Sequence, residues 1–122
     1  MSERSLQAQT IHQLLEDAEG PMSANELWMA SQGQGIGIAT VYRTLKRGVE
    51  SGELCEATLP GGQTRYEPAN LDHHHHFLCS DCERAIDLSG CVPGLDSILP
   101  SGFTMTNHEI LLFGQCSTCN AA

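Results

Sequence analysis

Two pairs of cysteines, each with two residues between its members, constrain this 122-residue sequence more than any other feature. The pairs are Cys79-x-x-Cys82 and Cys116-x-x-Cys119. This spacing lets both thiolates of a pair bind one ion, and two pairs supply the closed four-sulfur shell of a structural zinc site. Such a site contributes on the order of 10 kcal/mol to folding, which is decisive for a small unit. Two disulfides or a dithiol redox pair are the alternatives, although no thioredoxin-like βαβ pattern surrounds either pair.

A run of four histidines, residues 73–76, lies just before the first cysteine pair. Alternate side chains of an extended strand share a face, so the second and fourth imidazoles point to one side and the first and third to the other. One tract can therefore serve two metal sites. The further donors available are Glu67, Asp87, Asp96 and His108. These mixed donors suit zinc, iron, manganese or nickel, and composition does not choose among them. The alternative, a purification tag, fits the internal position of the tract poorly.

Two cysteines, Cys55 and Cys91, lie outside the pairs. Cys55 alternates with apolar residues on a predicted strand, which favours a buried thiol. Cys91 follows Asp87 closely, and it either joins a sensory metal site or has a structural role.

The first half of the sequence predicts helices and a hairpin. Helices are expected over residues 8–18, from residue 23, and over residues 38–49, and strands over residues 53–59 and 63–67. Ser23 and Glu26 form a capping-box signature at the start of the second helix. In that region Trp28 is expected in the core, and His12 on the solvated flank of the first helix. Three helices followed by a hairpin is the order of a winged helix-turn-helix, whose third helix enters the major groove of DNA.

The outer face of the third predicted helix carries side chains that suit contact with DNA: Thr40, Arg43, Thr44, Lys46 and Arg47. Arg43 and Arg47 are one turn apart, and guanidinium groups bond phosphates and guanine edges. The alternative is the solvated face of an ordinary amphipathic helix. The formal net charge of −9 weakens the DNA prediction, but five of the six basic residues precede residue 70.

The sequence as a whole predicts a mixed α/β (α+β) fold. We expect an N-terminal winged helix-turn-helix over residues 1–67, a hinge over residues 68–72, and a small metal-binding α/β unit over residues 73–122. In the last unit, strands are expected at residues 77–78, 85–88 and 104–113, and a short helical turn within residues 92–99. No apolar stretch approaches the roughly 20 residues of a membrane span, and no signal peptide opens the chain. We therefore expect a cytoplasmic protein with no membrane partner and no small organic substrate.

Three segments, residues 39–45, 73–82 and 107–119, resemble the ferric uptake regulator family. Together with the elements between them they cover nearly the whole chain. The resemblance implies a metal-responsive transcriptional repressor that is not an enzyme. It also implies a homodimer that binds a double-stranded DNA operator through the first unit and dimerises through the second.

The resemblance also assigns roles to individual residues. Structural zinc falls to the four paired cysteines, Cys79, Cys82, Cys116 and Cys119. The regulatory metal falls to Glu67, His74, His76 and Asp87. A third site falls to His73, His75 and His108, with Asp96 substituting for an acidic ligand that the shortened chain lacks. Tyr42 joins Arg43 on the DNA-binding helix.

The sensed metal stays open at this point. Glu67 and Asp87 resemble the ligands of iron and peroxide sensors, whereas a four-histidine tract is common among zinc sensors. A histidine that often joins the sensing site is replaced here by Gly20-Pro21-Met22. We favour zinc control of metal uptake genes, with Zn2+ at both sites and Fe2+ or Mn2+ as alternatives for the second. Within the family, the alternative is an iron- or peroxide-sensing regulator. Outside it, the rivals are a metal-dependent enzyme and a metal store or chaperone.

Overall fold

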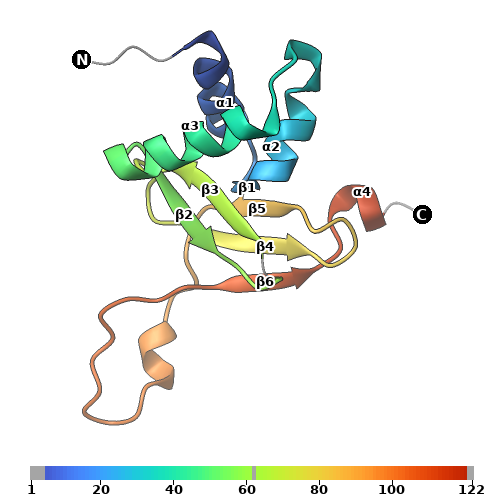
Figure 1. Cartoon of the computed structure of the whole chain (residues 1–122). Coiled ribbons are helices and arrows are strands. Elements are labelled where there is room, and N and C mark those ends of the chain that lie inside the picture. The colour runs from blue at the N-terminus through green and yellow to red at the C-terminus, as the bar shows by residue number, and fades with distance from the viewer. Residues whose placement is uncertain (1–4, 62, 121–122) are drawn as a thin grey trace. The chain divides into compact units, whose positions relative to one another are not determined.

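The computed structural model describes residues 5–61 and 63–120, and the chain divides into two compact units, Met1–Leu71 and Asp72–Ala122. The boundary falls within the predicted hinge, although Pro68 belongs to the last strand of the first unit. Figure 1 labels the helices and strands of both units. Among the described residues, no helix combines the length and apolar character needed to cross a membrane.

The first unit contains three α-helices and a three-stranded antiparallel sheet of order β1-β3-β2 (Figure 1). Its elements are α1 (Leu6–Asp17), β1 (Met22–Ser23), α2 (Ala24–Ala30), the 3-10 turn η1 (Gln32–Gln34), α3 (Ile38–Ser51), β2 (Leu54–Thr58) and β3 (Thr64–Pro68). The predicted capping box is confirmed, because the Ser23 side chain accepts from Glu26 N and the Glu26 side chain accepts from Ser23 N. Gly52, with φ 83°, ends α3 in the left-handed conformation that glycine adopts without strain.

The core of the first unit forms where the three helices meet β2. Its buried apolar residues are Ile11, Leu15, Ala24, Leu27, Ile36, Val41, Leu45 and Leu54. Two expectations for this region were wrong. Trp28 is 37% exposed, because Leu27 alone of the pair points inward, and His12 is 8% exposed beside Ile11 on the inner face of α1.

The second unit is built on a three-stranded sheet of order β5-β4-β6. Its elements are β4 (His75–Cys79), β5 (Ala85–Leu88), the 3-10 turn η2 (Leu95–Ile98), β6 (Leu111–Gly114) and α4 (Ser117–Asn120). The central strand β4 is antiparallel to β5 and parallel to β6. The strand expected over residues 104–113 is reduced to Leu111–Gly114, because its partner β4 pairs with it only from His76 to Cys79.

Candidate metal centres

The four paired cysteines come together at one end of the second unit. Their four Sγ atoms all lie within 4.8 Å of one another, and they belong to Cys79, Cys82, Cys116 and Cys119. The parallel pairing of β4 and β6 explains this convergence: Cys79 is in register with Gly114, so the chain turns toward Cys79 as it reaches Cys116. One sulfur–sulfur contact joins the two pairs, at 3.8 Å between Cys82 and Cys116. That is far longer than the roughly 2.05 Å of a disulfide bond.

Backbone amides surround the sulfur of Cys79. Cys82 N and Cys116 N donate to Cys79 Sγ at 3.5 and 3.4 Å. These two hydrogen bonds lower the pKa of Cys79 to about 6, which favours the thiolate that a metal needs. The sulfurs of Cys116 and Cys79 in turn raise the pKa of Cys119 to about 12. A divalent cation would relieve this competition, and four converging thiols are the donor set of structural zinc.

A second group forms on one side of β4. His76 lies opposite Asp87 in the register of β4 and β5. His74 Nε2 and His76 Nε2 lie 3.5 and 3.4 Å from Asp87 Oδ1. The side chains of both histidines are 18% exposed, and that of Asp87 is 28% exposed. His74 Nδ1 donates to the Asp72 carbonyl at 2.8 Å, which leaves the lone pair on Nε2, facing the group. Two imidazoles and a carboxylate are donors that suit zinc, iron(II) or manganese(II).

Glu67, the remaining residue expected at the regulatory site, belongs to the first unit. It lies on β3, where it is 8% exposed, and it is in register with Cys55 of β2. Cys55 is half-buried, and burial together with the charge of Glu67 raises the pKa of its thiol.

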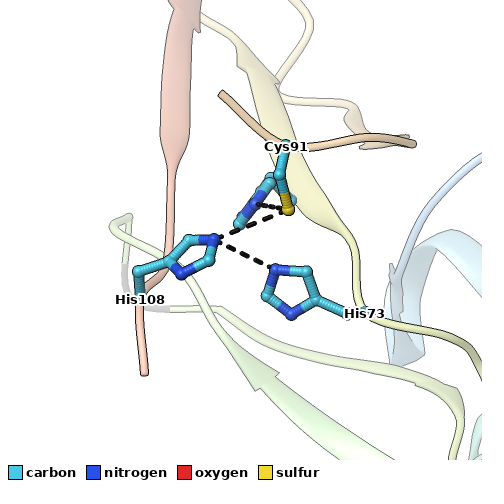
Figure 2. A group of neighbouring side chains, drawn as sticks. His73, Cys91 and His108 are labelled. Atoms are coloured by element: carbon cyan, nitrogen blue, oxygen red, sulfur yellow. Dashed lines mark hydrogen bonds between the residues drawn. The ribbon is translucent and has the colours of Figure 1, made fainter. Parts of the chain in front are cut away.

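A third group forms on the other side of β4, around His73 and His75 (Figure 2). His73 Nε2 lies 3.2 Å from His108 Nε2. Cys91 Sγ lies 3.4 Å from His75 Nε2 and 3.6 Å from His108 Nε2. Burial and the neighbouring imidazoles lower the pKa of His75, so its ring is neutral, as a metal ligand must be.

The fourth member of this group differs from the sequence prediction. Asp96 lies in η2 and is exposed, and the group that the structure brings together contains Cys91 in its place. A carboxylate was expected at this third site because the resemblance implies an acidic ligand in it. The available signal was an unpaired cysteine shortly after β5, in the segment that runs from Asp87 toward η2.

The predicted DNA-contacting residues divide between two faces of α3. Tyr42, Arg43, Lys46 and Arg47 are exposed, and Thr40 is half-buried and accepts a hydrogen bond from Arg43 Nη2 at 3.0 Å. Thr44 does not belong with them. It is 6% exposed and lies with Val41, Leu45 and Gly48 on the inner face of α3, because residues three and four apart share a side of a helix.

Known proteins match this chain over most of its length. The sequence model described as "Ferric uptake regulator family" matches residues 4–113. The ferric uptake regulation protein of Yersinia pestis is 33% identical over 104 residues, an alignment that covers 81% of this chain and 70% of the relative. The solved Vibrio cholerae ferric uptake regulator (Fur) has a TM-score of 0.69 and 29% identity, and the match covers 93% of this chain and 92% of that one. A zinc-bound manganese uptake regulator has a TM-score of 0.80 and 25% identity, with 94% and 91% covered.

A winged helix-turn-helix unit followed by a unit with histidine and cysteine donor groups defines a metal-responsive transcriptional regulator. The family match and the identity with relatives make the assignment more specific. The chain belongs to the ferric uptake regulator family.

Proposed function

We propose that the protein is a zinc-sensing repressor that controls metal uptake genes, and that it acts as a homodimer on operator DNA. The observation that carries this proposal is that the second unit keeps its four paired cysteines apart from the group of His74, His76 and Asp87. A four-sulfur group lies at one end of β4, while imidazoles and a carboxylate gather separately beside the same strand. Thiolate sites hold zinc permanently, whereas mixed nitrogen and oxygen sites exchange it more readily. Because its target is chromosomal DNA, we propose that the protein acts in the cytoplasm.

In this proposal the four paired cysteines bind structural zinc, and His74, His76 and Asp87 bind the sensed metal. Glu67 supplies a further oxygen ligand. Its carboxylate chemistry and its position just before the boundary between the units support that role. Ligands drawn from both units restrict how the first unit moves relative to the second. Metal occupancy then shifts the population toward the DNA-binding arrangement, provided that this arrangement holds the metal more tightly.

The exposed face of α3 is the proposed DNA contact. Arg43, Lys46 and Arg47 reach phosphates and base edges, with Tyr42 and Thr40 beside them. The second unit is the proposed dimer contact, because it exposes large apolar side chains there: Ile98, Phe103, Leu112 and Phe113. A two-fold dimer presents two copies of α3 to half-sites on consecutive turns of the operator.

The experiment uses an operator selected by the zinc-loaded protein from random-sequence duplexes. Gel-shift titrations compare protein with and without the exchangeable metal, for the wild type and for His74→Ala. The wild type should bind the operator only with metal, and His74→Ala should lose that response. Tighter DNA binding after removal of the exchangeable metal would reverse the proposal.

The DNA-contacting face has its own test. Arg43→Ala should weaken operator binding by roughly 1–3 kcal/mol and reduce the slope of log K against log salt by about one. Metal content should be unchanged. Arg43→Lys is the matched control, because it keeps the charge and loses the planar fork; the salt slope should be retained while operator preference falls. Unchanged binding by Arg43→Ala would exclude this face of α3.

Iron(II) sensing is the second candidate. It is favoured by the name of the Yersinia pestis relative, a ferric uptake regulation protein, and by the carboxylate of Asp87 in the histidine group. Metal-by-metal gel shifts under anaerobic conditions separate the two candidates. Activation by zinc at concentrations at which iron(II) has no effect favours zinc, and activation by iron(II) alone favours the alternative.

A further inference from the structure

The third group differs from the other two in its donor types. It combines three imidazoles with one thiol, and no carboxylate belongs to it. Its members come from separate parts of the second unit: His73 just before β4 and His75 at its first position, Cys91 from the loop after β5, and His108 from the segment before β6. Figure 2 labels His73, Cys91 and His108. Side chains from three segments of the second unit therefore meet here.

The rings of this group are packed against one another. Ring centroids lie 4.6 Å apart for His73 and His75, 4.8 Å for His73 and His108, and 5.0 Å for His75 and His108. Cys91 Sγ faces two of the rings, within 3.6 Å of a ring nitrogen of each. Three nitrogens and one sulfur around a common point form the set of four donors that a tetrahedral ion requires.

We propose that Cys91 takes the place of the carboxylate expected at the third metal site, so that His73, His75 and His108 offer three nitrogens and Cys91 one thiolate. This donor set selects zinc over manganese(II) and iron(II). The thiolate is the basis of the selectivity. Soft sulfur ligands favour zinc and related ions, whereas carboxylates favour manganese. With Cys91 in place of the Asp96 expected from sequence, the group holds one soft anionic donor and no hard one. The site shares no residue with the sensing group.

The exposure of the donors indicates an exchangeable ion. His73 and Cys91 are exposed, His108 is half-buried and His75 is 4% exposed. In the four-cysteine group, by contrast, Cys79 and Cys116 are buried, Cys119 is half-buried and Cys82 alone is exposed. A site that opens to solvent on two of its donors exchanges its ion faster than a closed one, so this site reports on available zinc rather than holding the fold together.

One hydrogen bond must change when the site fills. Ile110 N donates to His75 Nδ1 at 3.1 Å, so the proton of the neutral ring is on Nε2, next to Cys91 Sγ. To bind an ion through Nε2, the ring must carry its proton on Nδ1 instead. Ile110 N–H then loses its acceptor and shifts, immediately before β6 begins at Leu111. Filling the site therefore moves the chain at the start of β6.

The test uses the full-length protein with one equivalent of zinc already bound, titrated with cobalt(II). Binding to a thiolate gives a sulfur-to-cobalt charge-transfer band in the near ultraviolet, and this band is the readout. Wild-type protein should show the band, and Cys91→Ala should abolish it and weaken cobalt and zinc binding at this site by at least about 10–100-fold, the loss that even outer-shell changes cause. Cys91→Asp should bind metal without the band and prefer manganese(II) over zinc relative to the wild type.

Two matched variants complete the experiment. Asp96→Ala should leave the band unchanged, because the structure places Asp96 outside the group. His74→Ala should also keep the band, while losing the metal of the neighbouring group. A band that survives Cys91→Ala, or one that disappears in Asp96→Ala, would overturn the proposal. An Ile110 amide signal that does not move when zinc binds would overturn the Nε2 assignment for His75.

Discussion

Gly48 lies on the inner face of α3, directly against β2. A Cβ at this position would be 2.7 Å from Leu54 Cγ and closer still to Leu54 Cδ1. Leu54 is 4% exposed and part of the core, so it has little room to withdraw. The absence of a side chain at residue 48 thus sets how closely α3 approaches the sheet.

Gly48→Ala should therefore destabilise the first unit. Overpacking costs about 1–3 kcal/mol, and the better helix propensity of alanine offsets at most about 1 kcal/mol of this. Urea unfolding followed by the fluorescence of Trp28, the single tryptophan, measures the first unit alone. Gly33→Ala is the control, because a Cβ there meets nothing within 4 Å. Equal stability of the two variants would contradict the packing described here.

Residue chemistry was more predictable from sequence than residue orientation. Cysteine spacing predicted the four-sulfur group, because two intervening residues let both thiolates of a pair bind one ion. The parallel pairing of β4 and β6 then brings the two pairs together. The inward turn of Thr44 and the outward turn of Trp28 were missed, since a difference of one helical position depends on packing that no local pattern encodes. Sequence left the role of Cys91 open, because the imidazoles that it contacts come from distant segments of the chain.

At the scale of elements, the link between α2 and β3 depends on Glu26. Its Oε1 accepts from Ser23 N in the capping box and from Arg65 Nη1, each at 2.9 Å. Arg65 is 4% exposed, whereas the Glu26 side chain is 34% exposed. One oxygen thus fixes the start of a helix and the position of a buried guanidinium.

Glu26→Ala should cost about 1–3 kcal/mol, discounted from the value for a fully buried pair because Glu26 is partly exposed. Glu26→Gln keeps an oxygen acceptor for both donors and should lose about half as much. Unfolding followed by Trp28 fluorescence again measures the difference. If the glutamine variant is as unstable as the alanine variant, charge rather than hydrogen bonding holds the two elements together.

Element types were predicted better than element lengths. The three helices and the hairpin follow from apolar periodicity and from the capping box. The long strand expected over residues 104–113 was not found, because the extent of a strand depends on its partner and β4 is only five residues long.

At the scale of the whole molecule, the two units differ in how they are held together. The buried apolar residues of the second unit, among those the structure describes, are Cys79, Ala85 and Cys116. Two of these three belong to the four-sulfur group. The small apolar core of the second unit supports the proposal that a bound metal stabilises it, whereas the first unit relies on its core.

Zinc removal should consequently unfold the second unit alone. Cys119→Ser, or a strong chelator, should abolish the hydrogen-exchange protection of β4, β5 and β6, since such zinc contributes on the order of 10 kcal/mol. The first unit should keep its Trp28 emission. Cys55→Ser is the control, because Cys55 belongs to no donor group. Protection that persists without zinc would contradict the assignment.

The proposed dimer is also a property of the whole molecule. Phe103, 66% exposed, is the largest apolar side chain on its segment. Phe103→Glu should raise the dimer dissociation constant at least about tenfold, because burying such a ring contributes roughly 1.5–3 kcal/mol. Sedimentation velocity measures the change. Leu6→Glu, an equally drastic change at an exposed residue of the first unit, should leave the dimer intact.

A short strand that touches three donor groups has a consequence for the order in which ions arrive. Cys79 is the last residue of β4, and the imidazoles on the two sides of β4 are aligned only while that strand is formed. On the proposed function, the ion at the four cysteines must therefore bind first. The ions at the two imidazole groups can bind and dissociate afterwards. When the metal is depleted, such a protein would lose the ions of its imidazole groups long before it lost the ion that holds its fold.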